Sequence, residues 1–217
     1  MPIKIEVWGD YACFTRPEMK VERCSYDVMT PSAARGIVEA IYWHPGIRWV
    51  IDKIHVLNEI KFTNIRRNEV KSKISASKVR GVMSGGVEHL YITTSDDIAQ
   101  RAALVLQDVR YVIEAHFELV PEKMAPGDNE GKFCDIVKRR VAKGQCYHQP
   151  CFGTREFPAN FRTWDGGGEG AYQGTERDLG FMLYDMDYSN PEDITPMFFR
   201  AVMKNGVINL RDCEVYK

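Results

Sequence analysis

The chain has 217 residues, 44% of them hydrophobic, which suits one domain of ordinary size or two small ones with a packed core. No run of about 18 apolar residues is present, so a membrane-spanning helix is not expected. The net charge of -1 argues against a purely electrostatic nucleic-acid binder. The N-terminal stretch is typical of a strand and not of a signal peptide, and we expect a cytoplasmic protein.

The first quarter of the sequence predicts a strand, a helix and a second strand. Residues 3–14 alternate apolar and polar side chains, as in a strand with one buried face. Thr30 as N-cap and Pro31 at the first helical position begin a helix, which Pro45-Gly46 ends. Residues 48–62 are rich in β-branched side chains and predict one long strand.

The middle of the sequence predicts a long irregular segment, a strand and a second helix. Residues 64–97 are basic, have little periodicity and predict a mobile hairpin or loop. Residues 100–119 predict a strand, with a polar face that carries Arg110, Glu114, His116 and Glu118 from position 109 onward. Such a strand belongs to an antiparallel sheet with one face open to solvent or ligand. Residues 129–144 predict a second helix, which Gly144 ends.

The order of these elements is the β-α-β-β-α-β pattern of a ferredoxin-like, or RNA-recognition-motif-like, domain. We therefore expect an α+β protein whose first domain spans residues 1–158, with a basic hairpin insertion at about 64–97. Residues 159–217 contain short strand-like pieces, and Asn205-Gly206 between apolar runs indicates a hairpin. They predict a smaller C-terminal antiparallel β-sheet domain.

Cofactor motifs are weak in this sequence. The six cysteines are scattered and predict free thiols. Cys146, His148 and Cys151 could contribute to a zinc site, but their spacing fits no common finger, and a turn is the favoured interpretation. The glycine-rich residues 164–174 lack the dinucleotide-binding pattern and predict a flexible loop. We expect no metal and no cofactor.

Basic residues gather in two segments on this neutral background. They indicate either a polyanion partner or merely a solvated loop and a polar helix face. The residues expected to contact RNA are Arg66, Arg67, Lys71, Lys73, Lys78 and Arg80 in the first segment, and Lys138, Arg139 and Arg140 in the second.

Two side chains are candidates for proton-transfer chemistry. His116 lies on the polar strand face, where the sheet of an RNA-recognition domain contacts RNA. RNA cleavage without a metal needs one group to activate the 2′-hydroxyl, another to protonate the leaving 5′-oxygen, and a cation to stabilise the phosphorane. Histidine suits either proton-transfer role, and Tyr42 at the helix end can orient a hydroxyl. An incidental surface histidine and a packing tyrosine are the alternatives, and His44 is expected to be only a helix C-terminal residue.

The sequence resembles the fifth CRISPR-associated protein family in its type I-C (Dvulg) form. The resemblance covers nearly the whole chain and is carried by long segments in the family's order, among them EVWGDYACFTRPEMKVERCSYDVMTPSAARGIVEAIYW, QRAALVLQDVRYVIEAHFEL and NEGKFCDIVKRRVAKGQCYHQPCFGTREFPA. It implies a ferredoxin-like domain followed by a β-sheet domain. It also implies a metal-independent endoribonuclease that cuts precursor CRISPR RNA at the repeat hairpin and leaves a 2′,3′-cyclic phosphate. Such a protein remains on the 5′ handle in the Cascade antiviral complex, so the implied partners are the repeat hairpin and the backbone and large subunits of type I-C Cascade.

The resemblance also assigns residues. The family's catalytic tyrosine corresponds to Tyr42 and its histidine to His116, whereas its lysine is missing, because Glu114 and Ala115 precede the histidine. Arg110 or a basic residue of segment 61–80 could supply the positive charge. Two alternatives stay open: a subunit that caps the 5′ handle without cutting, and a metal-dependent nuclease acting on DNA.

Overall fold

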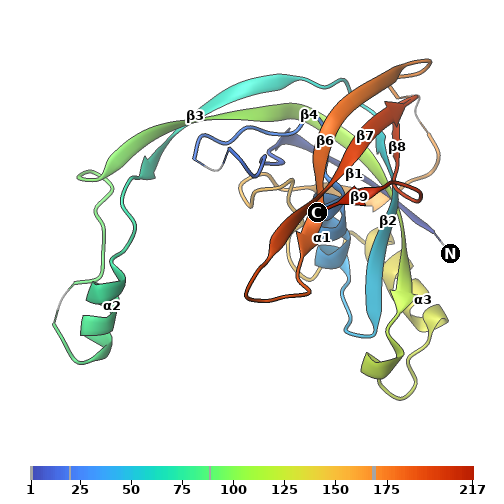
Figure 1. Cartoon of the computed structure of the whole chain (residues 1–217). Coiled ribbons are helices and arrows are strands. Elements are labelled where there is room, and N and C mark those ends of the chain that lie inside the picture. Colours follow the sequence, from blue (N-terminus) through green and yellow to red (C-terminus); the bar gives the residue numbers. More distant parts are fainter. Residues whose placement is uncertain (1, 20, 88, 168–169) are drawn as a thin grey trace.

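The computed structural model describes residues 2–19, 21–87, 89–167 and 170–217, which form nine strands, three α-helices and one short 3-10 helix (Figure 1). In chain order the elements are β1 (Ile3–Ala12), α1 (Pro31–Ile41), β2 (Ile47–Val56), β3 (Phe62–Val70), α2 (Ala76–Met83), β4 (Ile98–Leu119), η1 (Pro121–Lys123), α3 (Glu130–Ala142), β5 (Asn160–Thr163), β6 (Glu176–Asp187), β7 (Thr195–Lys204), β8 (Val207–Asn209) and β9 (Val215–Tyr216). None of these helices is both long and apolar enough to cross a membrane.

All of the described strands join in one antiparallel sheet. Its order is β5-β1-β4-β2-β8-β7-β6, while β3 pairs with the first half of β4 and β9 pairs with β7. Strand β4 is 22 residues long and contacts three partners: β3 with its first half, β2 with its second half and β1 along most of the second half. The protein is therefore mostly antiparallel sheet with few helices.

The single strand predicted over residues 48–62 is wrong, because the chain leaves the sheet after Val56 and β3 begins at Phe62. Residues of β4 up to Leu106 pair with β3, and residues from Tyr111 onward pair with β2. Asp108, between these two stretches, has a positive φ of 52°. On the other edge of β4, β1 pairs on both sides of Asp108, so the interruption concerns only the edge that β2 and β3 share.

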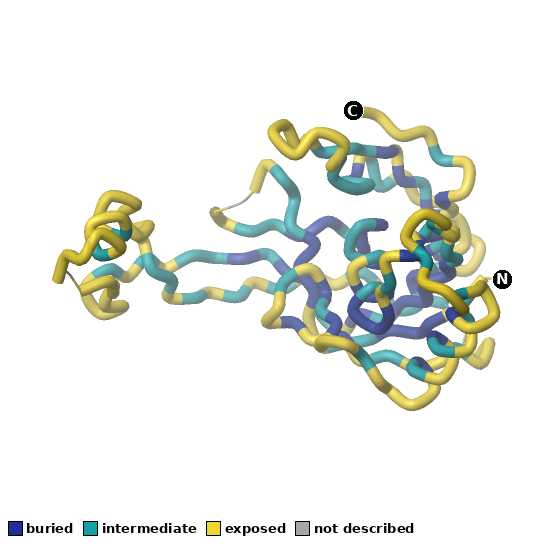
Figure 2. The backbone as a smooth tube through the Cα atoms, turned by 90° about the horizontal axis from the view of Figure 1, so that it is seen from below, coloured by how far each residue is buried: buried dark blue, intermediate teal, exposed yellow. Residues whose placement is uncertain are grey.

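Strand β3 and the first half of β4 form an arm that projects from the body and carries α2 at its tip (Figures 1 and 2). No residue of α2 is buried, and all of its residues except Val79 and Val82 are exposed. Our expectation of a mobile hairpin or loop over residues 64–97 did not include this helix. The apolar residues that normally reveal a helix are few here, because α2 packs against no core.

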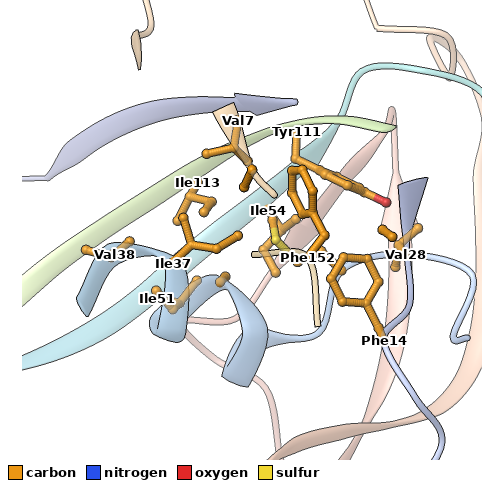
Figure 3. Close-up of a cluster of buried hydrophobic side chains, with 14 of the residues drawn as sticks. Val7, Phe14, Val28, Ile37, Val38, Ile51, Ile54, Tyr111, Ile113 and Phe152 are labelled. Carbon is orange, nitrogen blue, oxygen red and sulfur yellow. The ribbon is translucent and has the colours of Figure 1, made fainter. Parts of the chain in front are cut away.

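Helices α1 and α3 cover one face of the sheet. Their predicted starts and the end of α3 are confirmed, whereas α1 ends at Ile41, ahead of the predicted Pro45-Gly46. Thr30 caps α1 by accepting a hydrogen bond from the Ala33 amide (3.3 Å), and Asn129 caps α3 through the Lys132 amide (2.9 Å). Gly144 follows α3 with a positive φ of 63°. Ile37 and Val38 of α1 pack onto β-strand side chains in the core (Figure 3).

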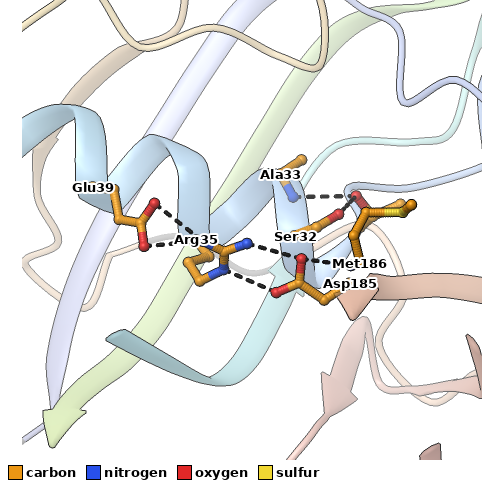
Figure 4. Close-up of polar contacts among 7 residues, drawn as sticks. Ser32, Ala33, Arg35, Glu39, Asp185 and Met186 are labelled. Carbon is orange, nitrogen blue, oxygen red and sulfur yellow. Dashed lines mark hydrogen bonds and ion pairs between the residues drawn. The ribbon is translucent and has the colours of Figure 1, made fainter. Parts of the chain in front are cut away.

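The β6–β7 hairpin is fastened to α1 by Arg35 (Figure 4). The Arg35 guanidinium contacts the Asp185 carboxylate at 2.8 Å and 3.0 Å, and Glu39 one turn along α1 at 3.0 Å. Burial alone would lower the pKa of Arg35, but the two carboxylates outweigh it and raise that pKa. This half-buried ion pair places β6 beside the helix.

The C-terminal strands extend the sheet of the N-terminal half. The predicted Asn205-Gly206 turn is confirmed, since both residues have positive φ (51° and 75°) and join β7 to β8. Strand β5 lies just beyond the predicted boundary at residue 158 and pairs with β1, while β8 pairs with β2. The division into domains at 158/159 stays a prediction.

Candidate active site

The second half of β4 has two chemically different faces. Ala115 is buried and Phe117 packs at right angles to Phe133 of α3, so this face meets the helices. Glu114 and His116 alternate with them and therefore point to the opposite face. The predicted polar face of this strand exists, and it lies on the side of the sheet away from α1 and α3.

Tyr42 lies on the helix side of the sheet. It caps the C-terminal end of α1, its carbonyl oxygen accepts a hydrogen bond from the Trp49 indole (2.9 Å), and only 6% of the residue is exposed. Its ring packs near Phe133, and the Arg140 guanidinium lies 5.2 Å from the ring centroid. Burial raises the pKa of the Tyr42 phenol, although the charge of Arg140 opposes this rise.

His44 belongs to the same cluster. Its ring lies 4.8 Å from the ring of Phe133, and its Nδ1 accepts a hydrogen bond from the Gly46 amide (3.0 Å). Its Nε2 is 3.6 Å from the carboxylate of Asp128. These contacts hold the turn after α1 in place, so His44 has a structural role at the end of this helix.

His116 forms a different cluster with two residues that the sequence analysis did not select. Its Nδ1 lies 3.0 Å from one carboxylate oxygen of Asp52, and the other oxygen accepts a hydrogen bond from Arg211 Nε at 3.0 Å. The Asp52 side chain is 3% exposed, compared with 36% for His116 and 51% for Arg211. Burial opposes ionisation of Asp52, but the hydrogen bonds from His116 and Arg211 outweigh it and lower the pKa of the carboxyl.

A β-bulge positions Asp52. Ile51 pairs with Ala115 and Lys53 with Glu114, so Asp52 is an extra residue in β2. Its backbone oxygen accepts a hydrogen bond from the Leu210 amide (2.9 Å), which brings the segment after β8 to the same place. Backbone and side chain of Asp52 together hold Arg211 beside His116.

Two further buried carboxylates on this face each bind two basic side chains. Glu114 contacts Lys4 and His55, both at 2.8 Å. Burial lowers the pKa of His55, and the Glu114 carboxylate, which acts in the opposite direction, does not offset this effect. Glu6 binds Arg110 at 2.6 Å and Arg162 at 2.7 Å.

Arg110 is therefore engaged elsewhere. Six residues of strand separate it from His116, which at about 3.3 Å per residue is roughly 20 Å. The structure does not bring Arg110 to His116, and its expected role as a substitute for the family lysine loses its geometric support.

The expected RNA-contacting residues fall in two places. Arg66, Lys71, Lys73, Lys78 and Arg80 are exposed on the arm, and Lys138 and Arg139 are exposed on α3. The remaining two are engaged within the protein. Arg67 pairs with Glu156 at 2.7 Å, and Arg140 donates a hydrogen bond to the Ile41 carbonyl at 2.7 Å.

Sequence reasoning could have noticed Asp52 but not Arg211. Asp52 is a charged residue within a run of apolar and β-branched residues, which is unusual for a buried strand. Arg211 stands in an ordinary polar tail and gives no such signal. At Cys146, His148 and Cys151 the zinc interpretation gains no support, because no group of three His, Cys, Asp or Glu side chains in the described ranges is arranged to hold a metal ion.

The family model described as CRISPR-associated protein (Cas_Cas5), in its Cas5d form, matches residues 3–211. A protein of Mannheimia succiniciproducens named CRISPR pre-crRNA endoribonuclease Cas5d is 54% identical, over 96% of this chain and 94% of its own. A protein of Thermus thermophilus with the same name is 39% identical, over 94% of this chain and 89% of its own.

Solved structures agree in fold. A crystal structure described as a CRISPR-associated protein superposes with a TM-score of 0.71 at 25% identity, covering 100% of this chain and 97% of its own. The Streptococcus mutans protein SMU1763c gives a TM-score of 0.70 at 23% identity with the same coverage. At this identity the second likeness concerns the fold alone.

Proposed function

The chain belongs to the Cas5 family of CRISPR-associated proteins, in its Cas5d form, and from this premise we propose that it is an endoribonuclease that cleaves precursor CRISPR RNA. The observation that carries the proposal is the 54% identity, over 96% of the chain, to a relative named for this activity. We propose that cleavage occurs at the repeat hairpin, without a metal ion, by attack of the 2′-hydroxyl to give a 2′,3′-cyclic phosphate.

Tyr42 and His116 are the proposed catalytic residues, in separate roles. His116 is proposed to transfer a proton at the scissile phosphate, and its place on the open face beside the ionised Asp52 supports this role. Tyr42, on the helix side with Arg140 over its ring, is proposed to contact the RNA strand next to the cleavage point. One phosphate group cannot touch both side chains, because the sheet lies between them.

The fold supports an RNA-recognition type of domain. The strand order β5-β1-β4-β2, with α1 after β1 and α3 after β4, is the arrangement of a ferredoxin-like unit. We propose that the predicted domain of residues 1–158, completed by β5, forms this unit and that the β3–α2–β4 arm is inserted in it. The exposed lysines and arginines of the arm and of α3 would bind RNA phosphates, so the affinity for RNA would fall as the salt concentration rises.

The same proposal includes assembly. We propose that the protein stays on the 5′ handle of the processed RNA and joins the backbone and large subunits of a type I-C Cascade complex.

The test is a cleavage assay on the protein's own repeat RNA in EDTA, with wild type, Tyr42→Phe and His116→Ala. We expect the wild type to cut and His116→Ala to lose about 10²- to 10⁴-fold in rate, the usual contribution of a general acid or base. Tight binding without cutting would assign a non-catalytic capping role. Cleavage of DNA that requires manganese would favour the metal-dependent nuclease.

A further inference from the structure

We propose that Arg211 supplies the positive charge that stabilises the phosphorane, and that Asp52 is a positioning residue that holds Arg211 and His116 toward one phosphate. This inference rests on the proposed endoribonuclease activity and names the group that replaces the missing family lysine. It follows from the geometry of three side chains, from β2, β4 and the segment after β8.

The first observation is the shared carboxylate. Asp52 binds His116 with one oxygen and Arg211 with the other, both at 3.0 Å. Because Nδ1 of His116 is bound, Nε2 is the ring nitrogen left to exchange a proton with a substrate. The hydrogen bond from Arg211 uses Nε, which leaves its two terminal amino groups as donors for the phosphate oxygens.

The second observation is a pocket at the same place. It has a volume of about 440 Å³, and the three side chains line it together with Val50, Tyr184 and Leu210. This volume lies in the range of ligand pockets in proteins, which is roughly 300–1,000 Å³. The buried carboxylate lies in its wall while the histidine and the arginine are partly exposed, so both the imidazole and the guanidinium are accessible to an anion.

The other carboxylate clusters of the open face lack this combination. At Glu114 the histidine is His55, whose side chain is only 19% exposed and lies near the indole of Trp164 (5.9 Å). At Glu6 both partners are arginines, so no group there can both take up and release a proton near neutral pH. In the described part of this face, the Asp52 cluster alone joins an accessible histidine to an accessible arginine.

The experiment measures single-turnover cleavage of repeat RNA in EDTA, with protein in excess. Affinity is measured separately on the same RNA with a 2′-deoxy residue at the cleavage point, which cannot be cut. The variants are Arg211→Gln, Arg211→Lys, Asp52→Asn and the double variant Asp52→Asn/Arg211→Gln. The matched control is Arg200→Gln, an exposed arginine paired with Asp178 in the β6–β7 hairpin.

We expect Arg211→Gln to lower the cleavage rate by about 10²- to 10³-fold, as for loss of one donor to a charged transition state. The affinity of Arg211→Gln for the uncleavable RNA should change by less than about 10-fold. The loss of cleavage rate in the double variant should be smaller than the product of the two single losses. Arg211→Lys should recover part of the rate. Arg200→Gln should cut like wild type.

Two results would overturn the inference while leaving the proposed function in place. One is undiminished cleavage by Arg211→Gln. The other is a loss confined to affinity, with no change in the single-turnover rate and no recovery by Arg211→Lys. Failure of the wild type to cut would overturn both proposals. A thermal melt of each variant identifies one that does not fold, and Arg211→Lys, which keeps the charge, then decides the question.

Discussion

The phenol of Tyr42 and the imidazole of His116 lie on opposite faces of the sheet. Tyr42 packs with Phe133 and Arg140 on the side of α1 and α3, whereas His116 bonds to Asp52 on the open side. A phosphodiester bound at His116 therefore meets Asp52 and Arg211, and RNA bound at Tyr42 meets the basic residues of α3. The two candidate catalytic residues must act at different points along the RNA.

Tyr42→Phe is the substitution that reports on chemistry at this position without disturbing the fold. It keeps the buried ring and removes only the hydroxyl, so the free energy of unfolding should change by no more than about 1 kcal/mol. Tyr42→Ala should cost about 3–5 kcal/mol, because it empties a buried aromatic site. Urea denaturation measures both values, and a loss above 2 kcal/mol for the Phe variant would contradict this account.

The arm should contribute to RNA affinity through charge alone. Replacing the exposed Lys73 and Lys78 by Gln should weaken binding to any RNA sequence and reduce the slope of log affinity against log salt by roughly 0.7–0.9 per lysine. Binding titrations at several salt concentrations measure this slope.

Two comparisons test the assignment of the arm. Arg67→Gln should have a smaller effect, because Glu156 already binds its guanidinium at 2.7 Å. Lys204→Gln, in the β6–β7 hairpin and paired with Glu176, should leave the slope unchanged. An equal loss for Lys204→Gln would mean that the arm makes no special contribution.

Stability should fall in mild acid because of the three buried carboxylates. In Glu6, Asp52 and Glu114, burial opposes ionisation, but the paired cations outweigh it and lower each pKa. A folded-state pKa below the unfolded value of about 4 means that the unfolded chain binds protons first as the pH falls. The stabilisation is thus complete above about pH 5 and is lost progressively below it.

The measurement is the melting temperature between pH 5 and pH 3. Glu6→Gln should melt lower at pH 7, since Arg110 and Arg162 lose their shared partner, but it should lose less on acidification than the wild type. Glu192→Gln, an exposed carboxyl at the turn between β6 and β7, should follow the wild-type curve. Identical acid curves for Glu6→Gln and wild type would refute the assignment.

Gly153 is expected to be irreplaceable. Its φ is +83°, and a Cβ atom there would lie 2.0 Å from the carbonyl oxygen of Cys13. Gly153→Ala should therefore destabilise the protein by at least the 1–3 kcal/mol of a strained backbone position. Gly36→Ala is the control, because a Cβ in that part of α1 meets nothing within 4 Å, and alanine should stabilise the helix by about 0.5–1 kcal/mol.

Local sequence patterns were sufficient to predict the elements that depend on interactions between residues close together in the chain. The side-chain oxygens of Thr30 and Asn129 cap their helices by accepting hydrogen bonds from backbone amides three residues further along the chain, and Asn205-Gly206 form their turn by their own backbone conformation. The alternation that exposed His116 on a polar strand face is equally local, since successive side chains of a strand point to opposite faces. Family resemblance assigned Tyr42 a catalytic role and added the expected activity.

The tertiary structure decided which groups meet. Strands β2 and β3 pair with separate stretches of β4, and α2 forms at the tip of an arm with no core to impose an apolar pattern. Asp52 and Arg211 are 159 residues apart and come together through a β-bulge and the pairing of β2 with β8. The sequence by itself determined α1, α3, the Asn205-Gly206 turn and the polar strand face. Sheet register depends on contacts between distant strands, so only the folded sheet placed Tyr42 and His116 on different faces and put Arg211 beside the histidine.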